Sequence, residues 1–292
     1  MANNRRIVCW NLHPEEIRPW RKNEIEYLEV ASKAIRDNDP FKRPIWTYDP
    51  AHANAKRLSK IAPSVDYLAK GMYTNYAGRK NARVFCRWTI EQEIEAFKLA
   101  GKEGIPLALP EMFQQPAEEE LEKIPAWVKH DVYLGLVSGA KGIVVFSARK
   151  RPKFPAYDTY FNAYVEVGKQ LLGPMRLADV FLFGERRNDL LVEVTDGPAE
   201  IEFVFASGGV KEPIKYPSLA HLDVALGNDR YLFVVNSANE PVTASIGGMP
   251  YNAVRAVSLL DNAEPIDVAE GEFEYRFAPL EVKAFKLERR GK

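Results

Sequence analysis

The chain has 292 residues, of which 46% are apolar and 11% aromatic, and its 40 basic and 40 acidic side chains leave no net charge. This length suits one large domain or two ordinary ones, and the apolar content excludes a disordered chain. The balanced charge argues against a general nucleic-acid binder, which normally carries a basic excess.

Cysteine content and the N-terminal sequence indicate the compartment. Cys9 and Cys86 are the two cysteines, too few for a disulfide framework and compatible with a reducing compartment. Only a short apolar run, residues 7–10, follows the N-terminus, and no run approaches the roughly 18–20 apolar residues of a membrane span. We expect no membrane association, and a cytoplasmic location for the sequence as written if residue 1 is the natural start.

The first part of the chain alternates short apolar runs with helical patterns. The apolar runs predict strands at 7–12, 44–48, 67–73, 105–109 and 143–147. The helical patterns predict helices at 23–36, 54–61, 90–102, 126–138 and 157–172, with Thr89 as the N-cap of the third. Near-continuous apolar strands separated by helices are typical of parallel sheets covered by helices.

The pattern of predicted secondary structure changes after Met175. Short strands separated by Gly, Asn, Asp and Pro are predicted at 189–194, 200–205, 222–226, 231–236, 242–246, 254–259, 273–277 and 282–287, a spacing typical of an antiparallel β-sandwich. Residues 1–175 hold 27 of the 40 basic and 21 of the 40 acidic side chains, so the charge balance also reverses there. We predict two domains, 1–175 and 176–292.

Polar and aromatic side chains gather where the predicted parallel strands end. In a barrel or open sheet of parallel strands, the chemistry lies at these carboxyl ends. The candidates, in chain order, are Asn11, His13, Glu15, Glu16, Trp46, Asp49, His52, Tyr73, Asn75, Tyr76, Glu111 and Arg149. Aromatic faces for stacking, amides and charges for hydroxyl groups, and carboxyl pairs for acid and base roles together predict a sugar site.

Five segments of the first part resemble a known family. These segments are 10–16 (WNLHPEE), 39–44 (DPFKRP), 87–89 (RWT), 105–113 and 133–147 (YLGLVSGAKGIVVFS). In this order they resemble the C-terminal half of a clan-A glycoside hydrolase of the β-galactosidase-like kind, from strand four to helix eight of its (β/α)₈ barrel. Residues 229–236 (DRYLFVVN) and 278–285 (APLEVKAF) resemble the β-sandwich that follows such barrels. The implied fold is a partial TIM-type barrel followed by an antiparallel β-sandwich.

The resemblance also implies catalytic roles. Clan-A enzymes place an acid/base glutamate after strand four and a nucleophilic glutamate after strand seven, which corresponds here to Glu15 or Glu16 and to Glu111. The family has Asn-Glu or Asp-Glu before proline after strand four, whereas this chain has His13-Pro14-Glu15-Glu16, so both glutamates stay open as the acid/base. The implied activity is retaining hydrolysis of a glycosidic bond, without a cofactor.

Several of the candidates also have a purely structural interpretation. Glu15 and Glu16 suit the first turn of a helix, and Asp49 before Pro50 suits a turn. Trp46 suits a core, and Arg149 suits a solvated basic loop. His13 and His52 belong to no His-x-x-His pair or carboxylate cluster, so we expect no metal site, and the absence of a Gly-rich phosphate loop predicts no nucleotide cofactor.

The predicted barrel is incomplete, because a full (β/α)₈ barrel has eight strands and this chain supplies five. Open strand edges favour association, so we expect a homo-oligomer or a partner that supplies the remaining strands. Two functions remain open. One is a retaining glycosidase, and the other is a non-catalytic carbohydrate-binding or structural fragment.

Overall fold

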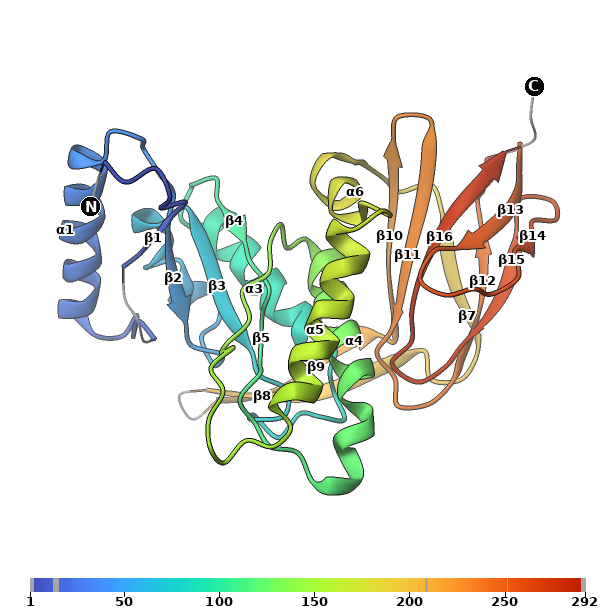
Figure 1. Cartoon of the computed structure of the whole chain (residues 1–292), viewed down its shortest axis with the longest axis horizontal. Coiled ribbons are helices and arrows are strands. Elements are labelled where there is room, and N and C mark those ends of the chain that lie inside the picture. Colours follow the sequence, from blue (N-terminus) through green and yellow to red (C-terminus); the bar gives the residue numbers. More distant parts are fainter. Residues whose placement is uncertain (1–2, 13–15, 208–209, 251, 290–292) are drawn as a thin grey trace.

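A curled sheet of parallel strands forms the first part of the structure, a computed structural model that describes residues 3–12, 16–207, 210–250 and 252–289. The strands β1 (Trp10–Asn11), β2 (Ile45–Asp49), β3 (Tyr67–Met72) and β4 (Ile105–Pro106) pair in this order, and each pairing is parallel (Figure 1). The predicted runs therefore become neighbouring strands of a half-barrel.

The last two predicted runs are less regular than expected. The run at 105–109 is divided into β4 and β5 (Leu109–Pro110), and β5 pairs with β3 as well. The run at 143–147 joins the sheet through parallel bridges from Ile143 to Ala108 and from Phe146 to Glu111. Beyond these bridges on one side and β1 on the other, the described residues supply no further strand, so both edges of the curled sheet are open.

Helices follow the strands of this sheet, and those over residues 85–99 and 124–138 pack directly on it. They are α1 (Lys22–Asn38), α2 (Ala55–Leu58), η1 (Ala62–Ser64), α3 (Phe85–Leu99), η2 (Glu118–Lys123), α4 (Ile124–Ser138), α5 (Tyr157–Leu172) and α6 (Leu177–Phe183). The prediction of Thr89 as an N-cap was wrong. Helix α3 starts a turn earlier, where Phe85 and Trp88 already supply buried apolar surface, and the Thr89 hydroxyl donates to the Phe85 carbonyl (2.9 Å).

Antiparallel sheets form the second part. The six-stranded sheet has the order β14-β13-β16-β11-β10-β6 and the three-stranded sheet has the order β15-β12-β7. The strands are β6 (Glu185–Arg187), β7 (Leu191–Asp196), β10 (Leu219–Leu226), β11 (Asp229–Asn236), β12 (Val242–Gly247), β13 (Ala253–Ser258), β14 (Ile266–Asp267), β15 (Phe273–Phe277) and β16 (Val282–Arg289). Apolar side chains from both sheets, such as Leu232 and Phe277, share one cluster.

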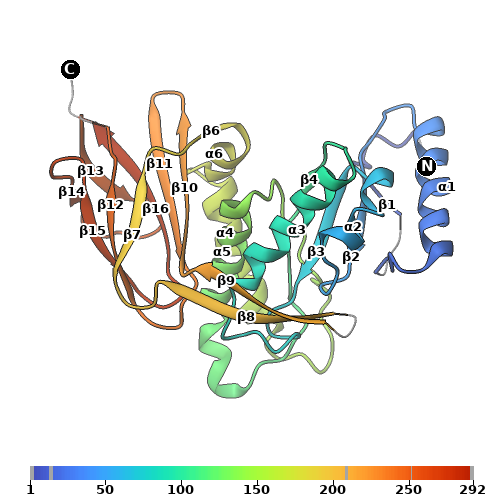
Figure 2. The ribbon, with the colours of Figure 1, turned by 180° about the vertical axis from the view of Figure 1, so that it is seen from behind.

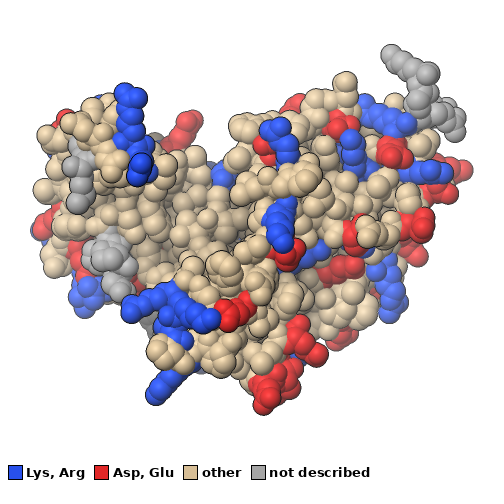
Figure 3. All heavy atoms as spheres, viewed as in Figure 1, with Lys and Arg blue, Asp and Glu red and all other residues tan. Residues whose placement is uncertain are grey.

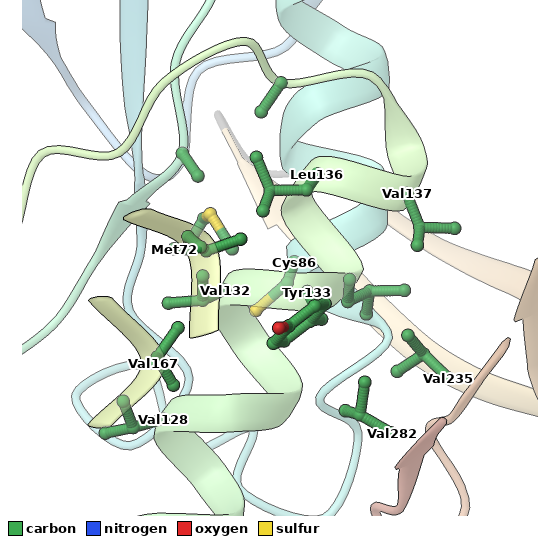
Figure 4. Close-up of a cluster of buried hydrophobic side chains, with 14 of the residues drawn as sticks. Met72, Cys86, Val128, Val132, Tyr133, Leu136, Val137, Val167, Val235 and Val282 are labelled. Atoms are coloured by element: carbon green, nitrogen blue, oxygen red, sulfur yellow. The ribbon is translucent and has the colours of Figure 1, made fainter. Parts of the chain in front are cut away.

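One core connects the two parts. Helix α4 lies between the curled sheet and the six-stranded sheet, and most of its residues are buried. Its Val132 and Tyr133 share a cluster with Met72 of β3 on one side and with Val235 and Val282 of β11 and β16 on the other (Figure 4). The half-barrel and the antiparallel sheets are therefore joined by continuous apolar packing.

A long hairpin, β8 (Glu200–Ser207) with β9 (Val210–Pro217), leaves the antiparallel sheets and crosses beneath the half-barrel (Figure 2). Its Phe203 and Phe205 pack on Phe85 and Trp88 of α3, with ring centroids 5.6 Å apart for Phe203–Phe85 and 4.4 Å apart for Phe205–Trp88. This hairpin fastens the second part to a helix of the first.

Within the described ranges, no helix combines the length and the apolar character needed to cross a bilayer.

Candidate functional site

A cavity of about 650 Å³ opens at the carboxyl ends of the parallel strands. Its lining comes from the segments after β1, β2, β3 and β5 and from the edge segment, and consists of Glu16, Arg18, Trp20, Tyr48, His52, Tyr73, Tyr76, Phe113 and Phe146. In the space-filling view, uncharged side chains dominate the hollowed inner face of the half-barrel (Figure 3). This is where parallel sheets place their ligand sites.

Aromatic rings form most of the cavity wall. Tyr48 stacks on Phe146 with centroids 4.8 Å apart, and Phe113 meets Tyr73 edge to face at 5.0 Å. Tyr76 lies 5.6 Å from Phe113 and is 66% exposed, so much of its ring remains free. Side chains at alternate positions of β2 point inward, which explains why Tyr48 faces the cavity together with Trp46 of the same inner cluster.

The polar groups of the cavity lie on one side. The Tyr48 hydroxyl donates to Glu16 Oε1 (3.4 Å), and Arg18 forms an ion pair with Glu24 at the start of α1. The Trp20 ring lies 5.4 Å from His52, whose pKa is lowered by partial burial and by the Arg57 charge. The cavity therefore joins a broad aromatic wall to a carboxylate, a guanidinium and an imidazole.

Glu111 lies directly after β5 and is buried, with 3% exposure. Its carboxylate accepts hydrogen bonds from the amides of Asn75 (2.5 Å) and Tyr76 (3.1 Å) and from the Thr74 hydroxyl (3.4 Å). Burial raises the pKa of Glu111 to about 7, although the two amide hydrogen bonds lower it. Glu111 thus fixes the loop after β3 instead of lining the cavity.

A buried polar network extends from this loop to the antiparallel sheets. Arg83 donates to the Asn75 side chain (3.0 Å) and forms a two-pronged ion pair with Asp131 of α4 (2.5 and 2.9 Å). His130 contacts Asp131 through Nδ1 (2.8 Å) and Ser237, just after β11, through Nε2 (2.9 Å). Burial lowers the pKa of His130, while the Arg83 charge holds the pKa of Asp131 low despite its burial.

The arrangement of serine, histidine and aspartate in this network is that of a hydrolytic triad, but its burial excludes that role here. His130 is 0% exposed and Ser237 is 1% exposed. Asp131 is already neutralised by Arg83. A substrate has no route to the Ser237 hydroxyl, so the network serves to join elements.

Asp49 lies on the opposite face of the sheet from the cavity. It is 0% exposed, accepts hydrogen bonds from Thr47 Oγ1 (3.1 Å) and from the Ala69 amide (3.3 Å), and burial raises its pKa to about 8. Burial also lowers the pKa of nearby Lys70 and raises that of Glu93, which caps the amides of Lys70 (2.5 Å) and Leu107 (3.0 Å). Asp49 is placed in a buried structural cluster under α3.

The structure brings together only some of the residues expected at the site. Glu16, His52 and Tyr73 line the cavity, and Trp46 packs beside it on the inner face. Asn75 turns away and donates to the Tyr160 hydroxyl (3.2 Å), while Asn11 and Arg149 are exposed outside the cavity lining. His13 and Glu15 lie outside the described residues.

Tyr76, expected after the third strand, also lines the cavity. Five cavity residues were absent from the predicted site, namely Arg18, Trp20, Tyr48, Phe113 and Phe146. Tyr48 and Phe146 lie within three residues of a strand end, so the rule that located Tyr73 was able to find them. Trp20 and Arg18 follow a segment without periodicity and carried no such signal. For metals, no group of three or more His, Cys, Asp or Glu side chains suited to an ion occurs within the described part of the chain.

Comparison with known proteins gives the fold. No protein-family model matches the chain, and no curated protein matches it. An α-amylase from Anoxybacillus, described as representing a new glycosyl hydrolase subclass, matches 92% of this chain with 8% identity and a TM-score of 0.54. The chain has a glycoside-hydrolase fold. Amy13B from Eubacterium rectale matches at 9% identity over 92% of the chain, with a TM-score of 0.53.

The match covers only part of these proteins. The chain spans 57% of the length of each of these two structures, and 60% of an α-amylase from H. orenii that matches at a TM-score of 0.50 and 10% identity. Identities this low establish the glycoside-hydrolase fold alone. The finer resemblance to clan-A barrels stays a prediction.

Proposed function

We propose that this protein binds carbohydrate in the aromatic cavity at the carboxyl ends of its parallel strands. The observation that carries the proposal is the cavity itself, in which Tyr48, Tyr73, Tyr76, Phe113 and Phe146 meet the carboxylate of Glu16. Ligand sites are typically apolar walls with a few convergent polar groups. A pyranose ring matches this combination, because its C–H faces stack on aromatic rings while its hydroxyls bind charged and polar groups.

The position of the cavity supports this ligand class over others. It lies on the face at which barrels of this kind hold their ligands, and the fold is that of glycoside hydrolases. The wall offers Arg18 and His52 but no glycine-rich phosphate loop, so a nucleotide fits less well. We infer a neutral sugar or short oligosaccharide as the ligand.

Titration calorimetry with a panel of gluco-, galacto-, manno- and xylo-oligosaccharides tests this proposal. Removing an exposed ring with Tyr76→Ala should weaken affinity about fivefold, since an aromatic contact contributes about 1 kcal/mol. Phe41→Ala, an aromatic residue of 43% exposure outside the cavity, is the matched control and should keep wild-type affinity. Equal losses in both variants, or no binding by the wild type, would refute the proposal.

A second candidate is hydrolysis, favoured by a carboxyl group of raised pKa at the carboxyl end of the sheet. In this proposal Glu111 is the nucleophile and Glu16 or Glu15 is the acid/base of a retaining double displacement, which requires carboxyl groups about 5–5.5 Å apart. A nucleophilic Glu111 must be ionised, so the rate should rise with pH through about 7. It must also leave its hydrogen bonds to the loop at residues 74–76.

Aryl-glycosides of several sugars, tested with wild type and Glu111→Gln, separate the two candidates. Hydrolysis predicts turnover that falls by at least about 1000-fold in the variant, in line with removal of a group that acts directly on the reacting atoms. Binding without catalysis predicts that the wild type binds sugar and that neither protein shows turnover. The open edges at β1 and at residues 143–146 further support association with another copy or with a partner that supplies strands.

A further inference from the structure

The rings that line the aromatic cavity form two separate groups. The first is the aromatic wall, in which each ring contacts at least one other, and it consists of Tyr48, Tyr73, Tyr76, Phe113 and Phe146. The second is Trp20, which contacts no ring of the wall among the described residues. Both groups line the same cavity of about 650 Å³. A ligand that fills the cavity therefore touches both.

The indole of Trp20 is held in place and is still accessible. The ring centroid of His52 lies 5.4 Å from that of Trp20, and the guanidinium carbon of Arg57 lies 5.6 Å from the Trp20 centroid. Trp20 is nevertheless 48% exposed. A large ring that its neighbours already fix can bind the apolar face of a ligand at little cost in side-chain ordering.

An extended segment, residues 16–20, connects the wall to Trp20. Glu16, Arg18 and Trp20 line the cavity, and the two residues between them are buried. This alternation is that of an extended chain, in which residues two apart point to the same side and lie about 6–7 Å apart. Glu16 accepts a hydrogen bond from Tyr48 of the wall, so up to about 13 Å of chain separates this contact from Trp20. That distance exceeds the width of one pyranose ring.

The polar groups along this segment suit the hydroxyls of an uncharged sugar chain. Glu16 supplies acceptors, and Arg18, whose side chain is 40% exposed, supplies donors. A hydroxyl group donates and accepts, so neighbouring units of one sugar chain can bind both side chains. Arg18 already forms an ion pair with Glu24, which balances its charge and favours a neutral chain over an anionic one.

We propose that Trp20 is a second sugar-binding platform and that the preferred ligand is an oligosaccharide of two or more units, with one unit on the aromatic wall and another on Trp20. The inference rests on the proposed carbohydrate binding and adds the length of the ligand to it. A single sugar covers one of the two aromatic groups and leaves the other in water. Trp20 thus determines specificity for chain length.

Titration calorimetry with the mono-, di- and tetrasaccharides of glucose, galactose, mannose and xylose tests this length preference. In a series that binds, wild-type affinity should rise at least about fivefold from the monosaccharide to the longer ligands, since a second aromatic contact is added. Trp20→Ala should remove this gain and leave monosaccharide affinity unchanged, while Tyr76→Ala should weaken binding at every length. Phe161→Ala, at an aromatic residue of 45% exposure outside the cavity, is the matched control and should keep the wild-type length dependence.

Trp20→Phe separates stacking from an effect on folding. This variant keeps an aromatic ring and should retain most of the affinity for the longer ligands, with a wild-type circular dichroism spectrum. The change in tryptophan fluorescence that these ligands cause in the wild type should be largely lost, because the other tryptophans are absent from the cavity lining.

The failure of this inference is distinguishable from the failure of carbohydrate binding. Equal wild-type affinity at all lengths, a length preference that persists in Trp20→Ala, or a loss in Trp20→Ala that is the same for monosaccharides and longer ligands would overturn the role of Trp20 alone. No binding of any sugar by the wild type would overturn both proposals.

Discussion

The carboxyl group of Glu111 is held in an environment that opposes its ionisation. It is 3% exposed, and its strongest partners are two backbone amides of the loop after β3. The amide hydrogen bonds favour the charged form but do not outweigh burial, so the pKa rises to about 7. Glu111 therefore changes charge near neutral pH and can couple the loop that carries Tyr76 to pH.

This coupling predicts a pH-dependent stability. The folded-state pKa of about 7 exceeds the reference value of 4.5, so the contribution of Glu111 to stability is full below pH 4.5 and is lost as pH rises through 7. Between pH 5 and pH 8 the wild type should therefore lose up to about 3 kcal/mol more unfolding free energy than Glu111→Gln. Urea unfolding of both proteins at the two pH values measures the difference. Parallel losses would contradict this account.

The sequence located Glu111 but not its contacts. Pro110 and the apolar run before it indicated the end of a buried strand, where a charged side chain is unusual and therefore suggests a function. The hydrogen bonds come from the loop at 74–76, which follows a different strand, and no local pattern specifies that contact. For Asp49, in contrast, a local pattern does predict its surroundings. Trp46 and Tyr48 face inward, so the two-residue period of a strand assigns Asp49 to the outer face.

At the scale of elements, helix α4 is held on both sides by buried polar contacts. Arg83, which lies just before α3, pairs with Asp131, and His130 joins Asp131 to Ser237 after β11. All four side chains are at least 96% buried in the structure. Such a network is satisfied only when the half-barrel and the antiparallel sheets are correctly docked.

Removing its members one at a time should have graded effects. Arg83→Met leaves Asp131 buried without its cation and should cost about 3–5 kcal/mol of unfolding free energy. Ser237→Ala removes one neutral hydrogen bond and should cost about 1 kcal/mol. Lys33→Ala breaks an exposed ion pair with Asp37 (2.7 Å) on α1 and should cost less than about 1 kcal/mol. Chemical denaturation gives all three values, and a small effect of Arg83→Met would contradict the network's role.

Elements with strong periodicity were predictable, and those shaped by contacts were not. The helix expected at 157–172 is α5, and the strand expected at 273–277 is β15. Strand β9 was missed because Pro213 and Pro217 argue against a strand. Among the described residues β9 pairs with β8 alone, so it tolerates prolines that a central strand would not. The early start of α3 depends on packing against the β8–β9 hairpin, which lies more than 100 residues away in the sequence.

At the scale of the whole molecule, the sequence changes its secondary-structure pattern at the predicted division, Met175, but the half-barrel and the antiparallel sheets share one core. Tyr133 of α4 is 0% exposed and lies in the same cluster as Val235 of β11. Neither part can expose this surface without a large loss of burial. The two parts should therefore stabilise each other.

Calorimetry should show this coupling as a single unfolding transition, with calorimetric and van't Hoff enthalpies in a ratio near 1. Tyr133→Ala removes a ring from the shared core and should lower the midpoint of that one transition without dividing it, at a cost of about 3–5 kcal/mol. Two resolved transitions in the wild type would show that the parts unfold independently and would contradict the shared core.

That the apolar runs of the first part form one parallel sheet was also predictable from the sequence, whereas the content of the hollow was not. Four of the five runs form strands β1 to β5, and the fifth joins the curled sheet only through isolated bridges. Which side chains fill the hollow depends on how strongly the sheet curls, because curling brings Tyr48 and Phe146 from distant strands to 4.8 Å. That curvature is a property of the whole sheet.

The central claim is that a sugar occupies this aromatic hollow. A crystal structure with a bound oligosaccharide, chosen from the panel by its affinity, tests it most directly. The account predicts a pyranose ring stacked on Tyr76 or Phe113, with a hydroxyl within hydrogen-bond distance of the Glu16 carboxylate. A sugar bound to the antiparallel sheets, with the aromatic hollow empty, would contradict it.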